Sequence, residues 1–275
     1  MKKPYTTAVV AICCGLAACA CLAAWYVASS RSAPSRLVEV VTDPRVVADQ
    51  LGFDAYFAGL TPCDLAARGA VSRESARAAY LASVMTTDTA GYVAKMEAAE
   101  AAGQSRQRRR MRVVVLDDRS APAPAGIESG WPHTHGDLIC MPASYLDRVG
   151  LVQLARTLAH ERTHVCQRMD PGRCMAPGAG PGAAGRVKVT DFDAQFPDLA
   201  ARRRSNPDLD GYLYRDDGGW LVVSLFDSEA AAAVGGLAAA RVMCVDPSTG
   251  RTVSAPRGTY EHPNEAHAYK SESES

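Results

Sequence analysis

The sequence predicts an α+β fold, in which a helical portion precedes a small mixed sheet. Three features indicate this class: Ala-rich segments with helical spacing of apolar residues between 44 and 104, short β-branched runs from residue 111 onward, and one long amphipathic segment at 151–169. The chain has 275 residues, 47% of them hydrophobic, which is enough for one sizeable core. We therefore expect one domain over 44–275, divided into a helical portion (44–104) and a second portion (111–275).

The first 30 residues have the composition of a membrane segment. Residues 6–28 carry no charge, two Lys residues precede them, and a Trp-Tyr pair stands near the far end, where aromatic side chains favour the membrane interface. A stretch of about 20 apolar residues can cross a bilayer. We expect 1–30 to be a signal anchor with one transmembrane helix and 31–43 to be a linker. The C-terminal domain would then be lumenal or extracellular.

Two alternatives for this segment stay open. The segment is rich in Ala and only moderately hydrophobic, so cleavage near Ala28 would give a secreted protein instead. A lipobox-like sequence ends at Cys19, but the residues that follow it remain apolar, which argues against a lipoprotein.

The charge balance argues against a nucleic-acid partner. Thirty basic and thirty acidic residues cancel, whereas a protein that binds nucleic acid through bulk charge is strongly basic. The basic run at 106–112 is an exception, which we interpret as a solvated helix end leading into a strand.

Five of the nine Cys residues lie in the folded part of the chain. Their wide spacing lacks the paired pattern of a structural zinc site. Because five is odd, at least one thiol stays unpaired even in an oxidising compartment. The five are Cys63, Cys140, Cys166, Cys174 and Cys244.

Start and stop signals define the expected elements of the helical portion. Asp43-Pro44 begins a helix, and Gly69 and Gly103 mark helix ends. Ala-rich stretches with helical spacing cover 64–68, 72–85 and 89–102.

Strands and turns dominate the rest of the second portion outside its long helix. The run 112–116 predicts a strand, and 138–141, closed by Pro142, predicts another. Two apolar runs around a Gly-containing turn predict a β-hairpin further on. The remaining expectations are loops at 120–126 and 172–185, a turn-rich stretch at 203–211, hairpin strands at 212–214 and 220–226, a helix at 230–240 weakened by two Gly residues, and a strand at 241–245.

The amphipathic segment 151–169 contains the arrangement His160-Glu161-x-x-His164. Residues four apart lie on one face of a helix, one turn above each other, so two imidazoles can converge on one metal ion. Glu161 can then reach a water molecule at the metal and take its proton. This combination indicates a zinc site with hydrolytic chemistry.

A catalytic zinc ion that is bound by two imidazoles needs one further protein ligand. The stretch 260–269 offers candidates near the end of the chain, and Pro263 would begin a helix there. Glu265 would lie on the first turns of that helix. Glu261 and His262 are alternatives.

These motifs resemble the gluzincin class of zinc metallopeptidases, in which HExxH on one helix is completed by a Glu on a downstream helix, often in an Asn-Glu pair. The resemblance implies a zincin-like domain, with His160, His164 and Glu265 as Zn²⁺ ligands and Glu161 as general base. The soluble region is also similar to uncharacterised metallopeptidase-like proteins of large DNA viruses and marine microbes. The chain departs from thermolysin in the roughly 100 residues between His164 and Glu265.

The resemblance also implies that the strand at 138–141 forms the edge of a substrate cleft, where a peptide adds as a further strand. His133 and His135 would lie at its entrance. They are candidates for contact with substrate or with the developing oxyanion, as are Tyr212 and Tyr260. Metal ligation by the His-x-His pair, or a plain loop role, are alternatives.

We expect a membrane-anchored, zinc-dependent metallopeptidase that acts on a peptide or protein substrate. Three alternatives remain: a non-catalytic module that binds zinc or a peptide, a membrane-tethered interaction protein, and hydrolysis of a non-protein amide or ester such as a cell-wall peptide.

Overall fold

The computed structural model describes residues 37–53, 56–103, 110–119, 127–175, 185–208 and 211–273. The predicted membrane helix and the loop at 120–126 lie outside these residues, as does most of the loop at 172–185. Among the residues that are described, no helix is both long enough and apolar enough to cross a membrane. The fold class is α+β, as predicted, with two small sheets.

The first sheet is mixed, with the strand order β1-β2-β4-β3. β1 and β4 run parallel to the central β2, and β3 runs antiparallel to β4. The strands are β1 (Val38–Val40), β2 (Met111–Leu116), β3 (His133–His135) and β4 (Leu138–Pro142). β1 lies within the segment expected to be a linker, so that expectation is wrong at 38–40: these residues pair with β2.

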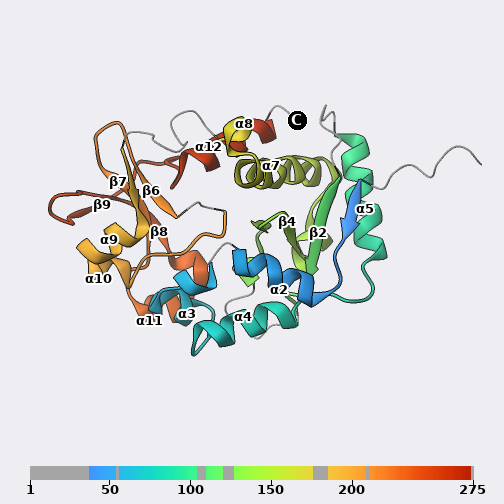
Figure 1. The fold of residues 1–275 in the computed structure, drawn as a ribbon, viewed down its shortest axis with the longest axis horizontal. Coiled ribbons are helices and arrows are strands. Elements are labelled where there is room, and N and C mark those ends of the chain that lie inside the picture. Colours follow the sequence, from blue (N-terminus) through green and yellow to red (C-terminus); the bar gives the residue numbers. More distant parts are fainter. Residues whose placement is uncertain are drawn as a thin grey trace, which may run out of the picture. The chain divides into compact units, whose positions relative to one another are not determined.

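Helices cover both faces of this sheet (Figure 1). Alternate residues of a strand point to opposite faces. Val114 and Leu116 of β2 therefore pack toward α2 (Pro44–Phe53) and α4 (Arg73–Ala82). Val113 and Val115 pack toward α5 (Ala90–Ala102) and α7 (Leu151–Met169). A strand that is covered on both sides is apolar throughout, and this explains the uninterrupted β-branched run.

The predicted helical portion is confirmed. Its elements are α2 (Pro44–Phe53), the 3-10 helix η1 (Phe57–Gly59), α3 (Pro62–Ala67), α4 (Arg73–Ala82) and α5 (Ala90–Ala102). Capping boxes begin α3 at Thr61 and α4 at Ser72. α4 ends three residues before the predicted end, because Val84 instead bridges to Leu116 of β2.

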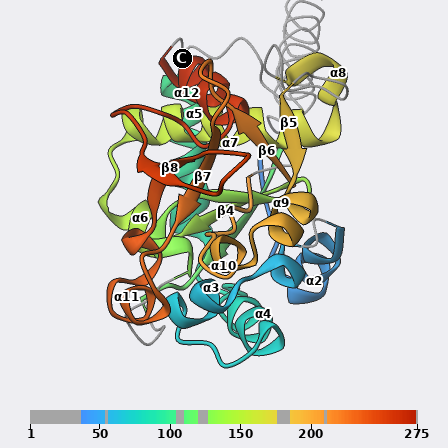
Figure 2. The ribbon, with the colours of Figure 1, turned by 90° about the vertical axis from the view of Figure 1, so that its left-hand side faces the viewer.

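The second sheet is an antiparallel meander, β5-β6-β7-β8-β9 (Figure 2). Its strands are β5 (Arg186–Lys188), β6 (Tyr212–Arg215), β7 (Leu221–Leu225), β8 (Arg241–Val245) and β9 (Thr252–Ser254). The predicted hairpin is confirmed as β6 and β7. α9 (Val189–Gln195) and α10 (Pro197–Ala200) pack against this sheet through Phe192 and Leu199.

The helix predicted at 230–240 is interrupted. α11 (Glu229–Gly235) ends where Gly236 takes a left-handed φ of 61°, and the 3-10 helix η3 (Gly236–Ala239) follows. Glycine adopts this conformation readily, so the Gly pair marks a helix end.

The long amphipathic helix is confirmed as α7 (Leu151–Met169), preceded by α6 (Ala143–Arg148). Leu154 and Leu158 pack on the sheet, whereas Leu151 and Met169, at the ends of the expected apolar stripe, are exposed. α12 (Pro263–Ser273) begins at the predicted proline and lies beside α7 (Figure 1, Figure 2).

The expectation that the strand at 138–141 forms a cleft edge is wrong. β4 pairs with β2 on one side and with β3 on the other, and all of its residues are buried. β3 is the edge strand. The backbone N–H of its central residue, Thr134, already donates a hydrogen bond to the Asp208 carboxylate at 2.8 Å. A peptide could add at that position only by displacing Asp208.

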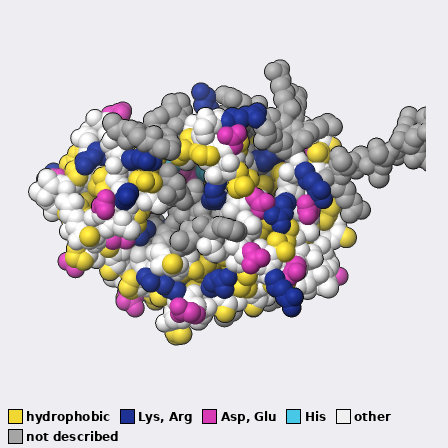
Figure 3. Space-filling view, in the orientation of Figure 1, with side chains coloured by type: hydrophobic (Ala, Val, Ile, Leu, Met, Phe, Trp, Pro, Cys, Tyr) yellow, Lys and Arg dark blue, Asp and Glu magenta, His cyan; other side chains and the backbone are white. Residues whose placement is uncertain are grey.

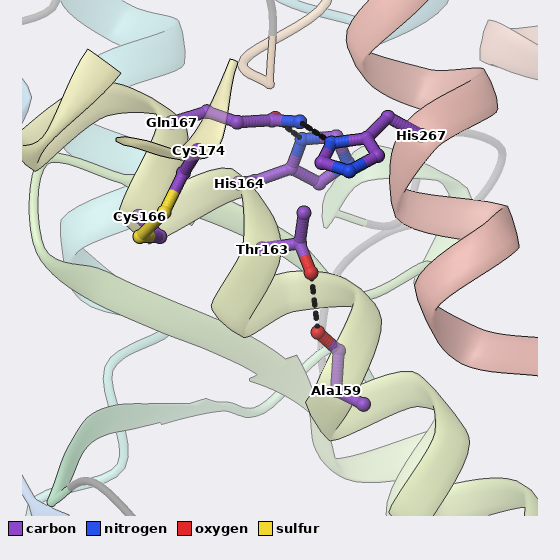
Figure 4. The surroundings of a disulfide bond; sticks show 7 residues. All are labelled: Ala159, Thr163, His164, Cys166, Gln167, Cys174 and His267. Atoms are coloured by element: carbon purple, nitrogen blue, oxygen red, sulfur yellow. Dashed lines mark hydrogen bonds between the residues drawn. A yellow bond between two sulfur atoms is a disulfide. The ribbon is translucent and has the colours of Figure 1, made fainter. Parts of the chain in front are cut away.

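A disulfide joins α7 to α8 (Pro171–Cys174), between Cys166 and Cys174 (Figure 4). Cys63, Cys140 and Cys244 form no disulfide and are buried. Three of the five cysteines in the folded part thus lie outside any disulfide, rather than the minimum of one.

We predict that Cys174→Ser lowers the free energy of unfolding by about 2.5 kcal/mol, because it opens a short covalent loop in the unfolded chain. Chemical denaturation of the oxidised wild type and the variant measures the difference. A reducing agent should lower the free energy of unfolding of the wild type to that of the variant. The stability of the variant itself should not change. Equal stability of the oxidised wild type and the variant would contradict a stabilising role for the bridge.

Candidate metal centre

Two imidazoles of α7 and one carboxylate of α12 converge at a buried point. The Nε2 atoms of His160 and His164 are 3.0 Å apart. The Glu265 carboxylate lies 3.7 Å from the first of these atoms and 3.5 Å from the second. His160 and His164 are buried, and the side chain of Glu265 is 14% exposed. This is the three-residue set that the sequence predicts.

The spacing of these donor atoms fits a zinc ion. In a tetrahedral site with bonds of 2.0–2.1 Å, neighbouring ligand atoms are roughly 3.3 Å apart. The observed separations of 3.0 to 3.7 Å bracket that value. Two nitrogen donors and one oxygen donor also match the ligand set of a catalytic zinc site, which keeps one position open.

Gln167 orients the His164 ring (Figure 4). Its amide nitrogen lies 3.3 Å from both the Asn264 carbonyl oxygen and Nδ1 of His267 on α12. The amide oxygen therefore faces His164, where it lies 2.9 Å from Nδ1. Nδ1 of His164 must donate this hydrogen bond, so Nε2 carries the lone pair that a metal ion needs.

Burial keeps both imidazoles neutral at physiological pH. It lowers the pKa of His160 to about 4, with a further contribution from the neighbouring His164. Burial also lowers the pKa of His164, although the nearby Asp208 carboxylate partly opposes this. Neutral imidazole is the form that binds metal, so neither ring has to lose a proton first.

The pKa of the Glu265 carboxyl is shifted upward instead. Burial, followed by the negative charges of Asp208 and Glu261, raises its pKa to about 8. The pKa of Asp208, in contrast, lies below its ordinary value. Burial alone would raise this pKa, but His164 and a hydrogen bond from Thr134 lower it by more. Before a cation binds, Glu265 is thus the carboxyl group that holds a proton near neutral pH.

Asp208 and Arg168 are site residues that the sequence analysis missed. Asp208 accepts hydrogen bonds from the backbone N–H and the hydroxyl of Thr134, at 2.8 and 2.6 Å. Arg168 of α7 donates to the carbonyl oxygens of Gly136 and Pro207, at 2.9 and 2.8 Å. Together they fasten the end of α7 and the 205–208 segment to β3. Neither residue belongs to a local motif, so no sequence signal distinguished them.

Glu161 and the three candidate ligands belong to one site. Glu161 is 4% exposed and lines a cavity of about 280 Å³ together with His160 and Glu265. Trp131, which is 65% exposed, lines the same cavity. The cavity therefore connects the expected general base with two of the three candidate metal ligands and reaches the surface.

The two alternative third ligands, Glu261 and His262, make contacts outside the candidate centre. Glu261 accepts a hydrogen bond from the backbone N–H of Ser224 at 3.0 Å, on β7. His262 is 1% exposed, accepts a hydrogen bond from the Asn264 N–H at 2.9 Å, and packs edge-on against Tyr214. Neither belongs to the converging group, so the geometry favours Glu265.

The two histidines of β3 are buried. His133 donates from Nδ1 to the Trp131 carbonyl oxygen at 3.0 Å and accepts from the Tyr80 hydroxyl at 2.7 Å, although its ring also lines the cavity. His135 is packed among aromatic rings, with the Tyr56 centroid at 5.2 Å and the Tyr80 centroid at 5.4 Å. Neither joins the candidate ligand group.

The two tyrosines that were proposed as oxyanion contacts do not line the cavity. The Tyr212 ring stacks under the Arg186 guanidinium at 4.0 Å, and Tyr260 is 45% exposed. Tyr269 lines the cavity instead, with its ring centroid 4.6 Å from that of His160. Tyr269 lies on α12, the same helix as Glu265, four residues further along the chain. It is the tyrosine that sequence reasoning missed.

We predict that zinc binding at about pH 6 releases about one proton per ion, because Glu265 is protonated beforehand and the imidazoles are neutral. Calorimetric titration in buffers of different ionisation enthalpy measures this number. In Glu265→Gln, which has no ionisable group at this position, the release should fall close to zero. An undiminished release in that variant would show that the proton comes from another group.

Comparison with known proteins assigns no family to this geometry. Neither the protein-family models nor the curated proteins nor the solved structures contain a match to this chain. The interpretation of the site therefore depends on the residues themselves. The convergence of two imidazoles, one carboxylate and a further buried Glu is the property that any proposed function must explain.

Proposed function

We propose that this protein is a zinc-dependent peptidase whose domain is zincin-like. The observation that supports this best is the convergence of His160, His164 and Glu265, because His160 and Glu265 also line one cavity with Glu161. A module that only bound zinc would need the three ligands but not a further buried carboxyl group beside them. The cost of burying Glu161 is expected where the side chain has a chemical role.

Each of these residues has a distinct part in the proposed reaction. His160, His164 and Glu265 would hold the ion, and Gln167 would keep the His164 ring in the binding tautomer. A zinc ion supplies Lewis-acid chemistry, which polarises the scissile carbonyl and makes water acidic near neutral pH. Glu161 accepts the proton of the attacking water and passes it to the leaving amine.

Tyr269 is the proposed donor to the oxyanion, in place of Tyr212 and Tyr260. Its ring packs against His160 and lines the cavity, which places a phenol beside the reacting groups. A hydrogen-bond donor that is held at this position would stabilise the charge that develops on the carbonyl oxygen.

Two further features bear on the proposed setting. The Cys166–Cys174 disulfide favours an oxidising compartment, and so supports a lumenal or extracellular domain. On the face shown in Figure 3, basic and acidic side chains are interspersed among apolar ones, which suits a peptide substrate better than nucleic acid. A membrane anchor at 1–30 stays a prediction.

We predict that Glu161→Gln, loaded with zinc to the wild-type level, hydrolyses a mixed peptide library about 10²–10⁴-fold more slowly than the wild type. The substitution keeps the shape of the side chain but removes its basicity. Glu229→Gln, at an exposed position on α11, is the matched control and should retain full activity.

Zinc content and turnover must be measured on the same samples. Zinc-loaded wild type that hydrolyses no peptide would favour a non-catalytic binding module. Equal rates for the wild type and Glu161→Gln would remove Glu161 from the mechanism.

A further inference from the structure

A second buried carboxylate, Glu128, lines the same cavity as His160, Glu161 and Glu265. It is 4% exposed and lies on the η2 segment (Ile127–Gly130), before β3. Its Oε1 atom accepts hydrogen bonds from the Tyr56 hydroxyl at 2.6 Å and from the Arg68 guanidinium at 2.8 Å. Its Oε2 atom is buried and has no hydrogen-bond partner among the described residues. A buried carboxylate oxygen without a partner is costly, so a ligand group is expected there.

The backbone holds Glu128 in an unusual conformation. Glu128 and the following Ser129 have left-handed φ values of 45° and 57°, and Gly130 continues at 71°. Residues with a Cβ atom rarely adopt this region, and such strain concentrates at functional sites. A turn hydrogen bond from the Trp131 N–H to the Glu128 carbonyl oxygen, at 3.1 Å, fixes the conformation. The strained turn directs the side chain into the protein rather than into solvent.

The surroundings of Glu128 keep it charged and leave an excess of negative groups. Burial raises the pKa of its carboxyl, but Arg68 and other positive neighbours outweigh this and lower the pKa to about 2. Arg68 is shared with a second buried carboxyl group, that of Asp64, at 3.2 Å. Two carboxyl groups thus surround a single guanidinium. Arg204 also lines the cavity, where its charge acts on Glu265 as well as on Glu128 and lowers the pKa of both.

We propose that Glu128 is a specificity-determining residue that binds a cationic nitrogen group of the peptide substrate through Oε2. The group is an ammonium, contributed either by the free amino terminus or by a lysine side chain. This inference depends on the proposed peptidase function, because it places the ammonium in the cavity of the zinc site. A charge-assisted hydrogen bond would satisfy Oε2 and balance the second carboxylate.

Four hydroxamates test the proposal, because a hydroxamate anchors on zinc and leaves its side chain in the cavity. N-acetyl-norleucine hydroxamate carries no ammonium and is the reference. Norleucine hydroxamate adds the α-ammonium, Nα-acetyl-lysine hydroxamate adds the side-chain ammonium, and lysine hydroxamate carries both. Their dissociation constants are measured by calorimetry near neutral pH with the zinc-loaded full chain, and with its Glu128→Gln and Glu229→Gln variants.

We expect at least one ammonium probe to bind the wild type about tenfold or more tightly than the reference. The probe that gains affinity identifies the source of the ammonium. In Glu128→Gln this preference should disappear, while the reference keeps its affinity; in Glu229→Gln, which alters an exposed carboxylate, the preference should persist. Gln retains an acceptor for Tyr56 and Arg68, and unfolding curves check that the variant is folded.

The other outcomes separate the two proposals. If the reference binds and no ammonium probe binds better, the role of Glu128 is wrong and the zinc site stands. If an ammonium preference survives in Glu128→Gln, another group is responsible and the assignment is overturned. If the wild type holds no zinc and binds no probe, the peptidase proposal fails and the inference fails with it. Should Glu128→Gln not fold, the wild-type preference among the four probes still decides whether an ammonium is recognised.

Discussion

The packing of α12 against α7 is the interaction on which the candidate centre depends. α7 alone carries the two imidazoles and Glu161, but the third donor arrives about 100 residues later in the chain. Gln167 connects the two helices, because one amide bonds both His164 and the Asn264 carbonyl oxygen. The link that joins α12 to α7 therefore also sets the tautomer of a candidate ligand. Docking of the last helix and assembly of the centre are one event.

α7 can serve this role because it is buried on two sides. Leu154 and Leu158 pack on the first sheet, and the adjacent stripe, which includes His160 and His164, faces α12 and the cavity. The sheet in turn is covered by helices on both of its faces. Arg168 and Asp208 extend the same support to the edge strand β3. The polar groups of the site are thus held by an apolar scaffold on one side and by hydrogen bonds on the other.

Local patterns predicted the elements but not their tertiary relations. The β-branched run of β2, the amphipathic spacing of α7 and the proline that begins α12 are local signals, and each appears in the fold. The pairing of β4 on both sides depends on β3, which is too short to show periodicity. Glu128 and Asp208 lie outside any motif. Only the folded chain shows that they share a cavity with His160 and Glu161 of the HExxH motif.

Zinc K-edge X-ray absorption on the purified protein is the sharpest check on the proposed centre, because it reports the atoms around the ion. We expect imidazole nitrogen and carboxylate oxygen at about 2.0–2.1 Å and no sulfur, with one zinc per chain by elemental analysis. In His164→Ala, which removes one of the two imidazole ligands, the zinc content should fall and the imidazole scattering of any zinc that is retained should weaken. A sulfur shell at about 2.3 Å, or a folded protein that retains no zinc, would contradict the proposed centre.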